Sequence, residues 1–249
     1  MAKVIQAELD SPGVVTSHDC STNALINYVT AAGWGTDEFD RWWPARHVIG
    51  KDINRLHTIY WPAMLMSAGL PLPRLVWVHG WLLAQGERMS KSRGNFLDPN
   101  DVVAALGRDG TRYAVLSEVA FDKDSDVSWD SFVRRYNADL ANDFGNLLNR
   151  SLSMTKRYRG GERSAPTDGT LAGAWAPVFE TYGQKLEACL LHEALETLWS
   201  FVGEANRFVE AEQPWTLAKA AKNGDAEADE KLTGVLGDLL EACRVIALA

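Results

Sequence analysis

The 249-residue sequence has little cysteine and no long apolar segment. Its three cysteines, Cys20, Cys189 and Cys243, are far apart and form no Cys-x-x-Cys pair, which argues against a zinc site and for a reducing, cytoplasmic compartment. No apolar run approaches the roughly 20 residues that a membrane-spanning helix needs, and the first residues lack the basic and apolar blocks of a signal peptide. A formal net charge of −8 disfavours indiscriminate nucleic-acid binding but is compatible with a local basic face.

What the sequence does contain is ample apolar surface. Apolar residues make up 46% of the chain and include ten tryptophans, enough for the cores of one large or two modest domains. The polar stretch at residues 122–126 is the best candidate for a boundary. Short apolar runs that resemble strands lie before it, and apolar residues at helical intervals lie after it. We therefore predict two domains, residues 1–121 and 122–249.

A cationic loop follows the second of the apolar runs. Residues 75–83 have the continuous apolar character of a buried strand, residues 88–93 read Arg-Met-Ser-Lys-Ser-Arg, and Asp98-Pro99 is typical of a helix start. Cations in such a loop can neutralise charge that develops on a polyphosphate leaving group, and the flexible stem of Lys91 can follow a moving phosphate. From composition alone, a solvated basic hairpin explains the same residues.

A second motif, Gly50-Lys-Asp-Ile-Asn-Arg-Leu-His57, follows a short β-like run at residues 47–49. Glycine at a strand end lets a ligand approach the backbone closely. Ile53 and His57 are four residues apart, so they share one face of the helix that begins there. Open α/β sheets bind ligands at the carboxyl ends of their strands, which makes this face a candidate site. A histidine buried for structural reasons is the alternative.

Helical spacing dominates the second half of the sequence. It predicts a long helix to about residue 158, followed by helices over about 168–189, 191–210 and 227–247. Pro214 breaks the pattern and places Trp215 at a junction, where an aromatic ring can stack on an unpaired base. The structural alternatives are that Trp215 fills a core and that the basic residues near residue 158 only complement a helix dipole.

Together these motifs resemble the methionyl-tRNA synthetases, a family of class I aminoacyl-tRNA synthetases. Arg-Met-Ser-Lys-Ser is similar to the family's Lys-Met-Ser-Lys-Ser signature, and Gly-Lys-Asp-Ile-x-x-x-His followed by Tyr-Trp-Pro-Ala-Met-Leu is characteristic of the family. The resemblance covers residues 23–249. It implies a fold that is α/β and then all-α, with part of a Rossmann-like nucleotide-binding domain before the boundary and an anticodon-binding helix bundle after it.

The resemblance also implies roles for individual residues. Lys91, with Arg88, would be catalytic and would hold the phosphates of ATP. The other implied residues form three sets: Gly50, Asp52, His79, Ser90, Lys91 and Ser92 for ATP; Tyr28, Ile53 and His57 for methionine; and Asn146, Arg150 and Trp215 for the anticodon. Taken without the family, Tyr28 is better explained as an ordinary core aromatic. ATP with Mg²⁺, methionine and its tRNA are the implied substrates and partners, and no zinc is expected.

The sequence departs from the family at two points. Ser21 stands where the family has the tryptophan of its methionine pocket, and the family's first strands, its His-x-Gly-His signature and its cysteine-bearing connective domain are missing. A parallel sheet with too few strands exposes an edge and apolar faces, so we expect residues 1–121 to be only partly stable alone. The expected function is that of a truncated methionine–tRNA ligase, inactive by itself. The alternatives are a non-catalytic tRNA-binding module, one half of a split synthetase that a separate N-terminal piece completes, and a remnant without function.

Overall fold

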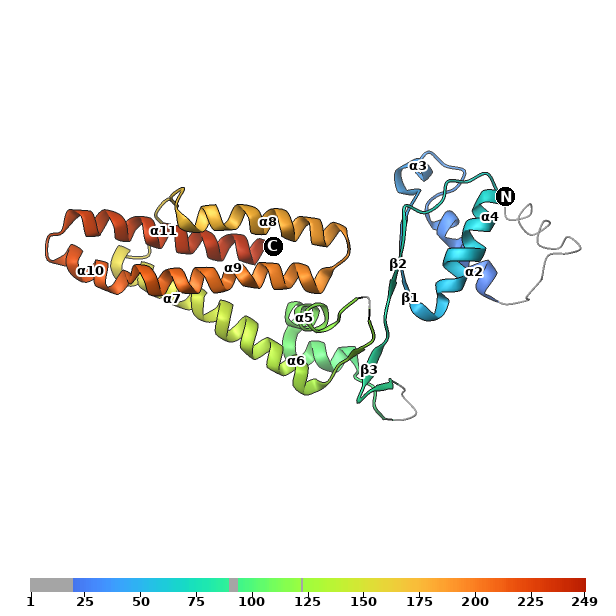
Figure 1. Cartoon of the computed structure of the whole chain (residues 1–249), viewed down its shortest axis with the longest axis horizontal. Coiled ribbons are helices and arrows are strands. Elements are labelled where there is room, and N and C mark those ends of the chain that lie inside the picture. The colour runs from blue at the N-terminus through green and yellow to red at the C-terminus, as the bar shows by residue number, and fades with distance from the viewer. Residues whose placement is uncertain (1–19, 90–93, 122) are drawn as a thin grey trace, which may run out of the picture. The chain divides into compact units, whose positions relative to one another are not determined.

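The structure, a computed structural model, describes residues 20–89, 94–121 and 123–249, with side chains from residue 24 onward. The chain divides into two compact units, Met1–Trp81 and Leu82–Ala249 (Figure 1). Unit 1 contains strands and helices, whereas unit 2 is almost entirely helical after a small sheet. The expected order, α/β and then all-α, is confirmed. The boundary after residue 121 between catalytic and anticodon-binding parts stays a prediction.

Unit 1 is built on two parallel strands. The helices α2 (Cys20–Ala31) and α3 (Phe39–Trp42) precede strand β1 (Arg46–Gly50). A 3₁₀ turn η1 (Lys51–Ile53), a π-helical segment η2 (Leu56–Tyr60) and helix α4 (Trp61–Ser67) then lead to strand β2 (Leu75–His79). The two strands pair in parallel, with Val48 opposite Trp77.

The core of unit 1 lies on one side of this strand pair. In β1, His47 and Ile49 are buried while Val48 between them is 58% exposed, which is the period-two alternation of a sheet with one covered face. The buried cluster consists of Leu25, Val29, Ala32, Phe39, Trp43, Trp61, Leu65 and Leu70. It comes from α2, α3, α4 and the residues that follow them. The rings of Tyr28 and Trp43 connect this cluster to β1 by packing on His47.

The prediction of one continuous strand over residues 75–83 is wrong. It divides into β2, which ends at His79, and β3 (Leu82–Ala84) in unit 2. The reason is pairing: β2 pairs with β1, whereas β3 pairs with β4 (Glu87–Arg88) and β5 (Ser125–Asp126) in a separate sheet of order β4-β3-β5. An apolar run carries no information about which partner each of its residues will find.

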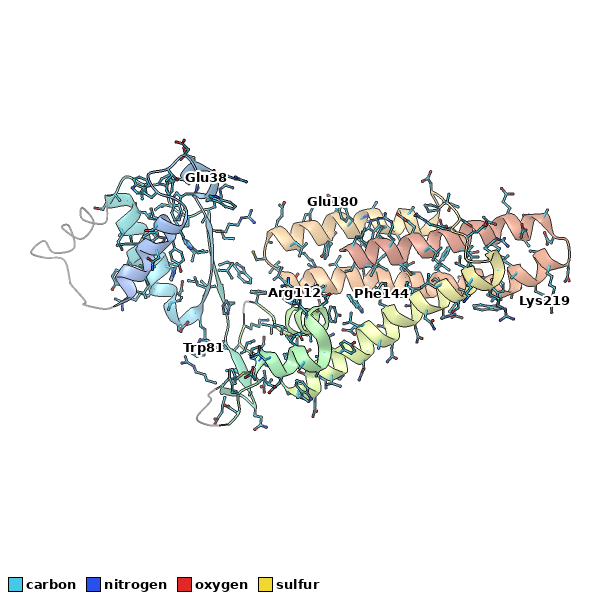
Figure 2. All side chains as sticks on the ribbon, turned by 180° about the vertical axis from the view of Figure 1, so that it is seen from behind. Glu38, Trp81, Arg112, Phe144, Glu180 and Lys219 are labelled. Atoms are coloured by element: carbon cyan, nitrogen blue, oxygen red, sulfur yellow. The ribbon has the colours of Figure 1, made fainter. Side chains whose placement is uncertain are left out.

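Local signals set the starts of the next helices, and the start at Asp98-Pro99 was predicted. Asp98 accepts a hydrogen bond from Asn100 N at 2.8 Å and starts α5 (Pro99–Glu118), which is kinked at Gly107 with φ +72°. Helix α6 (Trp129–Arg135) starts with a reciprocal cap between Ser128 and Ser131. It continues through the π-helical segment η4 (Tyr136–Phe144) into α7 (Gly145–Arg159), and Figure 2 marks Phe144 at that junction.

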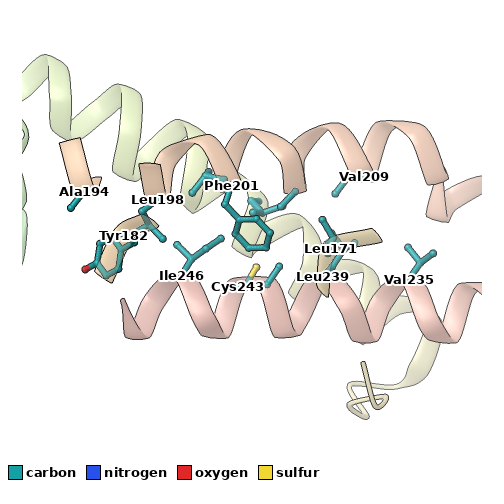
Figure 3. Packing of buried hydrophobic residues seen from close by; sticks show 14 residues of the cluster. Leu171, Tyr182, Ala194, Leu198, Phe201, Val209, Val235, Leu239, Cys243 and Ile246 are labelled. Atoms are coloured by element: carbon teal, nitrogen blue, oxygen red, sulfur yellow. The ribbon is translucent and has the colours of Figure 1, made fainter. Parts of the chain in front are cut away.

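The helices that follow form a bundle with α7. These are α8 (Thr170–Glu187), α9 (Leu191–Glu212), α10 (Pro214–Lys222) and α11 (Ala226–Leu248). Leu171 of α8, Phe201 of α9 and Leu239 of α11 meet in its core (Figure 3). Burying each such side chain stabilises the fold by roughly 1.5–3 kcal/mol. The three long helices were predicted; α10 was not, because Pro214 looked only like a helix breaker, whereas it occupies the first turn of α10.

Candidate functional site

In unit 1, Tyr28 and His57 form a hydrogen-bonded pair. The second partner of His57, a backbone carbonyl, determines which ring nitrogen carries the hydrogen. The Tyr28 hydroxyl lies 2.9 Å from His57 Nε2, and His57 Nδ1 lies 3.0 Å from Ile53 O. A backbone carbonyl can only accept, so Nδ1 carries the hydrogen and Nε2 of the neutral ring accepts from Tyr28. His57 is 3% exposed, whereas Tyr28 and Ile53 are each 37% exposed. Tyr28 and Ile53 are therefore accessible to solvent, while the imidazole that bonds to both residues is buried.

A second histidine, which the sequence reasoning missed, supports this pair. His47 is 5% exposed, and its Nε2 accepts a hydrogen bond from Trp61 Nε1 at 3.2 Å. Its ring centroid is 4.5 Å from that of Tyr28. Burial, and then the nearby His57, lower the pKa of His47 below its usual range. The position of His47 on the covered face of β1 is the signal that was available, because His47 and Ile49 alternate with exposed residues.

Three of the residues predicted to bind ATP meet at the carboxyl end of the strand pair. Gly50 and His79 are opposite each other in the register of β1 and β2. A Cβ on Gly50 would lie 2.8 Å from Asp52 Oδ1, so a side chain there would displace the Asp52 carboxylate, and it would contact His79 Cε1 at 3.7 Å. Glycine thus keeps the backbone open at the edge where parallel sheets bind ligands. Beside it, Lys51 Nζ lies 3.9 Å from the centroid of the Trp81 ring.

The base of the signature loop is well defined in unit 2. Gln85 and Gly86 have φ values of 57° and 75°, as a tight hairpin turn requires, and Gly86 N–H donates to Asp126 Oδ2 at 2.9 Å. Arg88, in β4, is exposed, and its carbonyl accepts a hydrogen bond from Asn95 Nδ2 at 3.3 Å. Ser90, Lys91 and Ser92 lie outside the described residues, so their predicted roles remain predictions.

The residues predicted to read the anticodon lie on α7 and α10, two helices that pack against each other. Asn146 is exposed one helical turn before Arg150, and Trp215, 41% exposed, lies in the first turn of α10. Arg150 Nη2 is 2.6 Å from Glu210 Oε1, with side chains 38% and 62% exposed. An exposed pair of this kind is worth about 0–1 kcal/mol, so Arg150 can exchange it for another partner cheaply. Glu210 was missed because it is 60 residues away in sequence.

Two negative findings concern metals and membranes. In residues 20–89, 94–121 and 123–249, no three His, Cys, Asp or Glu side chains are grouped so that they can hold a metal ion. Over the same residues, none of the helices combines the length and apolar character needed to cross a membrane.

Known proteins resemble this chain along most of its length. A solved structure of methionyl-tRNA synthetase from Mycobacterium tuberculosis, bound by methionyl-adenylate, matches with a TM-score of 0.85 and 39% identity over 92% of this chain and 46% of that one. The methionine–tRNA ligase of Thermotoga maritima is 43% identical over 234 residues, and that of Mycobacterium bovis is 44% identical over 238 residues. Each covers 91% of this chain, which spans only 36% and 45% of those relatives.

The family model also matches, and it includes both strand ends and the signature loop. The model for class I (M) tRNA synthetases covers residues 22–152, more than half of the chain. This range contains Tyr28, Gly50, His57 and Asn146. The sequence motifs, the fold and the similarity to solved synthetase structures agree, and the chain belongs to the class I tRNA synthetase family of the methionine type.

Proposed function

We propose that this chain supplies part of the catalytic domain and the anticodon-binding domain of a methionine–tRNA ligase. Residues 1–121 would contribute to methionine activation, and residues 122–249 would bind the tRNA. The family reaction joins the methionine carboxylate to the α-phosphorus of ATP with loss of pyrophosphate, and then passes methionine to the terminal adenosine of tRNA with loss of AMP. The observation that carries the proposal is the arrangement of Tyr28, His57 and Ile53 beside the carboxyl ends of β1 and β2.

Methionine is an unbranched thioether that needs an apolar site with one weak polar contact. The exposed faces of Tyr28 and Ile53 provide apolar and aromatic surface. His57 is held in one orientation by its bonds to Tyr28 and to Ile53 O, so the polar edge of the site is fixed before the substrate arrives. Preorganisation of this kind lowers the entropic cost of binding. Ser21 occupies the place of the family's pocket tryptophan, which predicts a more open pocket.

ATP would enter as its magnesium complex, and we assign no residue of this chain as a magnesium ligand. Gly50, Asp52 and His79 lie together at one strand edge, where the open backbone at Gly50 leaves room for a nucleotide. Lys91 and Arg88 would stabilise the negative charge that grows on pyrophosphate as it leaves. Asn95 ties the base of the loop to the Arg88 carbonyl, which fixes the end from which Arg88 projects.

Recognition of the anticodon would use Asn146, Arg150 and Trp215. An amide and a guanidinium one helical turn apart can form paired hydrogen bonds with the edges of splayed bases. Stacking of a base on an exposed aromatic ring is worth about 1–3 kcal/mol. We therefore expect Trp215→Ala to weaken binding of the methionine tRNA by about 5- to 150-fold. Trp34→Ala is a matched control, because Trp34 is 42% exposed and lies in unit 1.

The deciding measurement is methionine-dependent exchange of pyrophosphate into ATP by the purified chain. Exchange above background that disappears in Lys91→Ala would assign catalysis to this chain. No exchange, together with tRNA binding that Trp215→Ala weakens, would instead support the second candidate, a tRNA-binding module. If tRNA binding were unchanged by Trp215→Ala, the anticodon assignment would be wrong.

A specific observation favours a third candidate, one half of a split synthetase. In the part of unit 1 that the structure describes, β1 and β2 pair only with each other, and Val48 on the uncovered face is 58% exposed. Parallel sheets are normally covered on both faces. Adding the part of the Thermotoga maritima relative that this chain does not match would restore exchange if such a half completes the site. If exchange were not restored, the split-synthetase candidate would be excluded.

Two further points belong to the proposal. A cytoplasmic location fits a chain in which Cys189 and Cys243 are free thiols. No zinc is expected to take part, because the three cysteines are isolated in sequence. Both statements are testable, by localisation of the tagged protein in its native cell and by metal analysis of the purified chain.

A further inference from the structure

A groove between α7 and α11 in unit 2 is not used by the proposed function. Its volume is about 600 Å³, and its walls include Leu152, Lys156, Leu240 and Arg244, with the loop residue Arg163 at one end. Leu152 and Lys156 lie one turn apart on α7, across its buried stripe of Leu147, Ser151 and Thr155 from Asn146 and Arg150. The groove is therefore on the opposite flank of α7 from the residues assigned to the anticodon.

The cations of the groove exceed the carboxylates that neutralise them. Arg244 donates to Glu241 through Nε at 2.8 Å and Nη2 at 2.5 Å, and Arg163 Nη2 donates to the same carboxylate at 3.2 Å. Lys156 makes no ion pair with any residue that the structure describes. Arg163 and Arg244 share one carboxylate and Lys156 has none, which leaves a local formal charge of +2 in a chain whose overall charge is −8.

These hydrogen bonds orient the two guanidinium groups and leave some of their N–H donors available. A guanidinium carries five N–H donors; Glu241 takes two from Arg244 and one from Arg163. The remaining donors, with the three of the Lys156 ammonium, are free for an anion of matching charge. Arg244, which bonds to Glu241, holds the pKa of that carboxyl below its usual range, so the arrangement persists in mildly acidic solution.

The helix dipole explains only part of this cluster. Lys156 is in the last turn of α7, where a cation is favourable. Arg163 lies beyond that helix, and Arg244 is on α11, whose last turn contains no basic residue. The helix dipole therefore does not explain why Arg163 and Arg244 lie at the groove. The apolar side of the groove also needs an explanation, because Leu152 remains 52% exposed there.

We propose that this groove binds a phosphate ester. The phosphate would be held by Lys156, Arg163 and Arg244, and the apolar part of the ligand would lie on Leu152 and Leu240. A free nucleotide and a phosphodiester of an RNA strand share this chemistry. The proposal does not depend on methionine activation or on anticodon reading, because none of its residues takes part in either.

Leucine-methyl NMR of the full chain tests this directly, with adenosine monophosphate as the first probe. Substitutions Leu152→Ile and Leu240→Ile assign the two reporter methyl groups. We expect saturable shifts of both, and a dissociation constant raised at least about tenfold in Lys156→Gln, since charge-assisted hydrogen bonds are the strong ones. Arg207→Gln is the matched control: Arg207 pairs with Glu204 three residues away on α9, as Arg244 pairs with Glu241, and should change the constant less than twofold.

The second probe, an RNA hairpin with the anticodon stem-loop sequence, separates the two sources. Shifts of both methyl groups with the hairpin but not with the nucleotide assign the groove to an RNA phosphodiester. In Trp215→Ala the nucleotide shifts should persist, so failure of the anticodon assignment is distinguishable from failure of this one. The proposal is overturned if neither probe moves the two methyl groups, or if Lys156→Gln and the charge-preserving Arg244→Lys bind both probes as the parent does.

Discussion

Gly237→Ala should destabilise the helix bundle, because there is no room for a methyl group at this position. A Cβ on Gly237 would lie 2.2 Å from Ala165 O and 2.8 Å from Ala165 C. The chain around residues 164–169 would have to move away from α11. That segment is held there by Asp238, which is 7% exposed and accepts hydrogen bonds from Thr167 N at 2.5 Å and Thr167 Oγ1 at 2.7 Å.

The expected change in the free energy of unfolding combines two destabilising contributions and one stabilising contribution. Overpacking costs about 1–3 kcal/mol, and loss of one hydrogen bond to the buried Asp238 carboxylate costs about 1.5–3 kcal/mol. Alanine is a better helix former than glycine by about 1 kcal/mol. The free energy of unfolding should therefore fall by about 1.5–5 kcal/mol. For a unit of this size, each kcal/mol lowers Tm by about 2–4 °C, so we expect a decrease of roughly 3–20 °C.

Thermal unfolding followed by far-UV circular dichroism measures this change in the full chain. Gly183→Ala is the matched control, because it lies inside α8 and a Cβ there meets no atom within 4 Å. The control should gain the helix propensity of alanine and raise Tm by about 2–4 °C. Equal stability of the Gly237 variant and the parent would refute the close approach of this loop to α11.

Three further changes have definite expected outcomes. Tyr113→Phe removes a hydrogen bond of 2.7 Å to Asp139, whose side chain is 13% exposed, and should cost about 1.5–3 kcal/mol in urea unfolding; no cost would show that Arg135 alone satisfies the carboxylate. Ser128→Ala removes the N-cap of α6 and should cost about 1 kcal/mol, whereas Ser153→Ala on the exposed face of α7 should cost less than about 0.5 kcal/mol. Because burial lowers the pKa of His47 relative to the unfolded value of 6.5, its contribution to stability is complete above pH 6.5 and is lost as pH falls below it; an NMR titration of the ring with a midpoint at or above 6.5 would contradict this.

Local chemistry made the helix boundaries predictable from sequence. Asp98-Pro99 and the pair Ser128 and Ser131 satisfy exposed N–H groups within a few residues, so the signal and the structure are adjacent in the chain. The same is true of Ile53 and His57, whose spacing alone places them on one helical face. Pro214 shows the limit of such reasoning, since one residue type can end one helix and begin the next.

Contacts between distant segments could not be predicted in the same way. The division of the apolar run at residues 75–83 depends on β1 and β5 as partners, which the run itself does not encode. Likewise His47 and Glu210 bond to Trp61 and Arg150 through tertiary packing. The alternation in β1 indicates that His47 is buried but not which residue it bonds to, and nothing near Glu210 in the sequence marks its partner. Sequence reasoning therefore found the residues that motifs carry and missed the ones that hold them in place.

The two units differ in what they can do without further structure. The bundle buries Leu147, Phe201 and Leu239 from three of its own helices, so the positions of Asn146 and Arg150 on α7 depend only on unit 2. In unit 1, Val48 lies exposed on a two-stranded parallel sheet, and the hydrogen-bonded pair of Tyr28 and His57 belongs to this same small unit. Adenylation requires groups fixed to within a fraction of an ångström, whereas binding of a splayed RNA loop tolerates more. We therefore expect tRNA binding to be retained under conditions in which methionine activation by this chain alone is not.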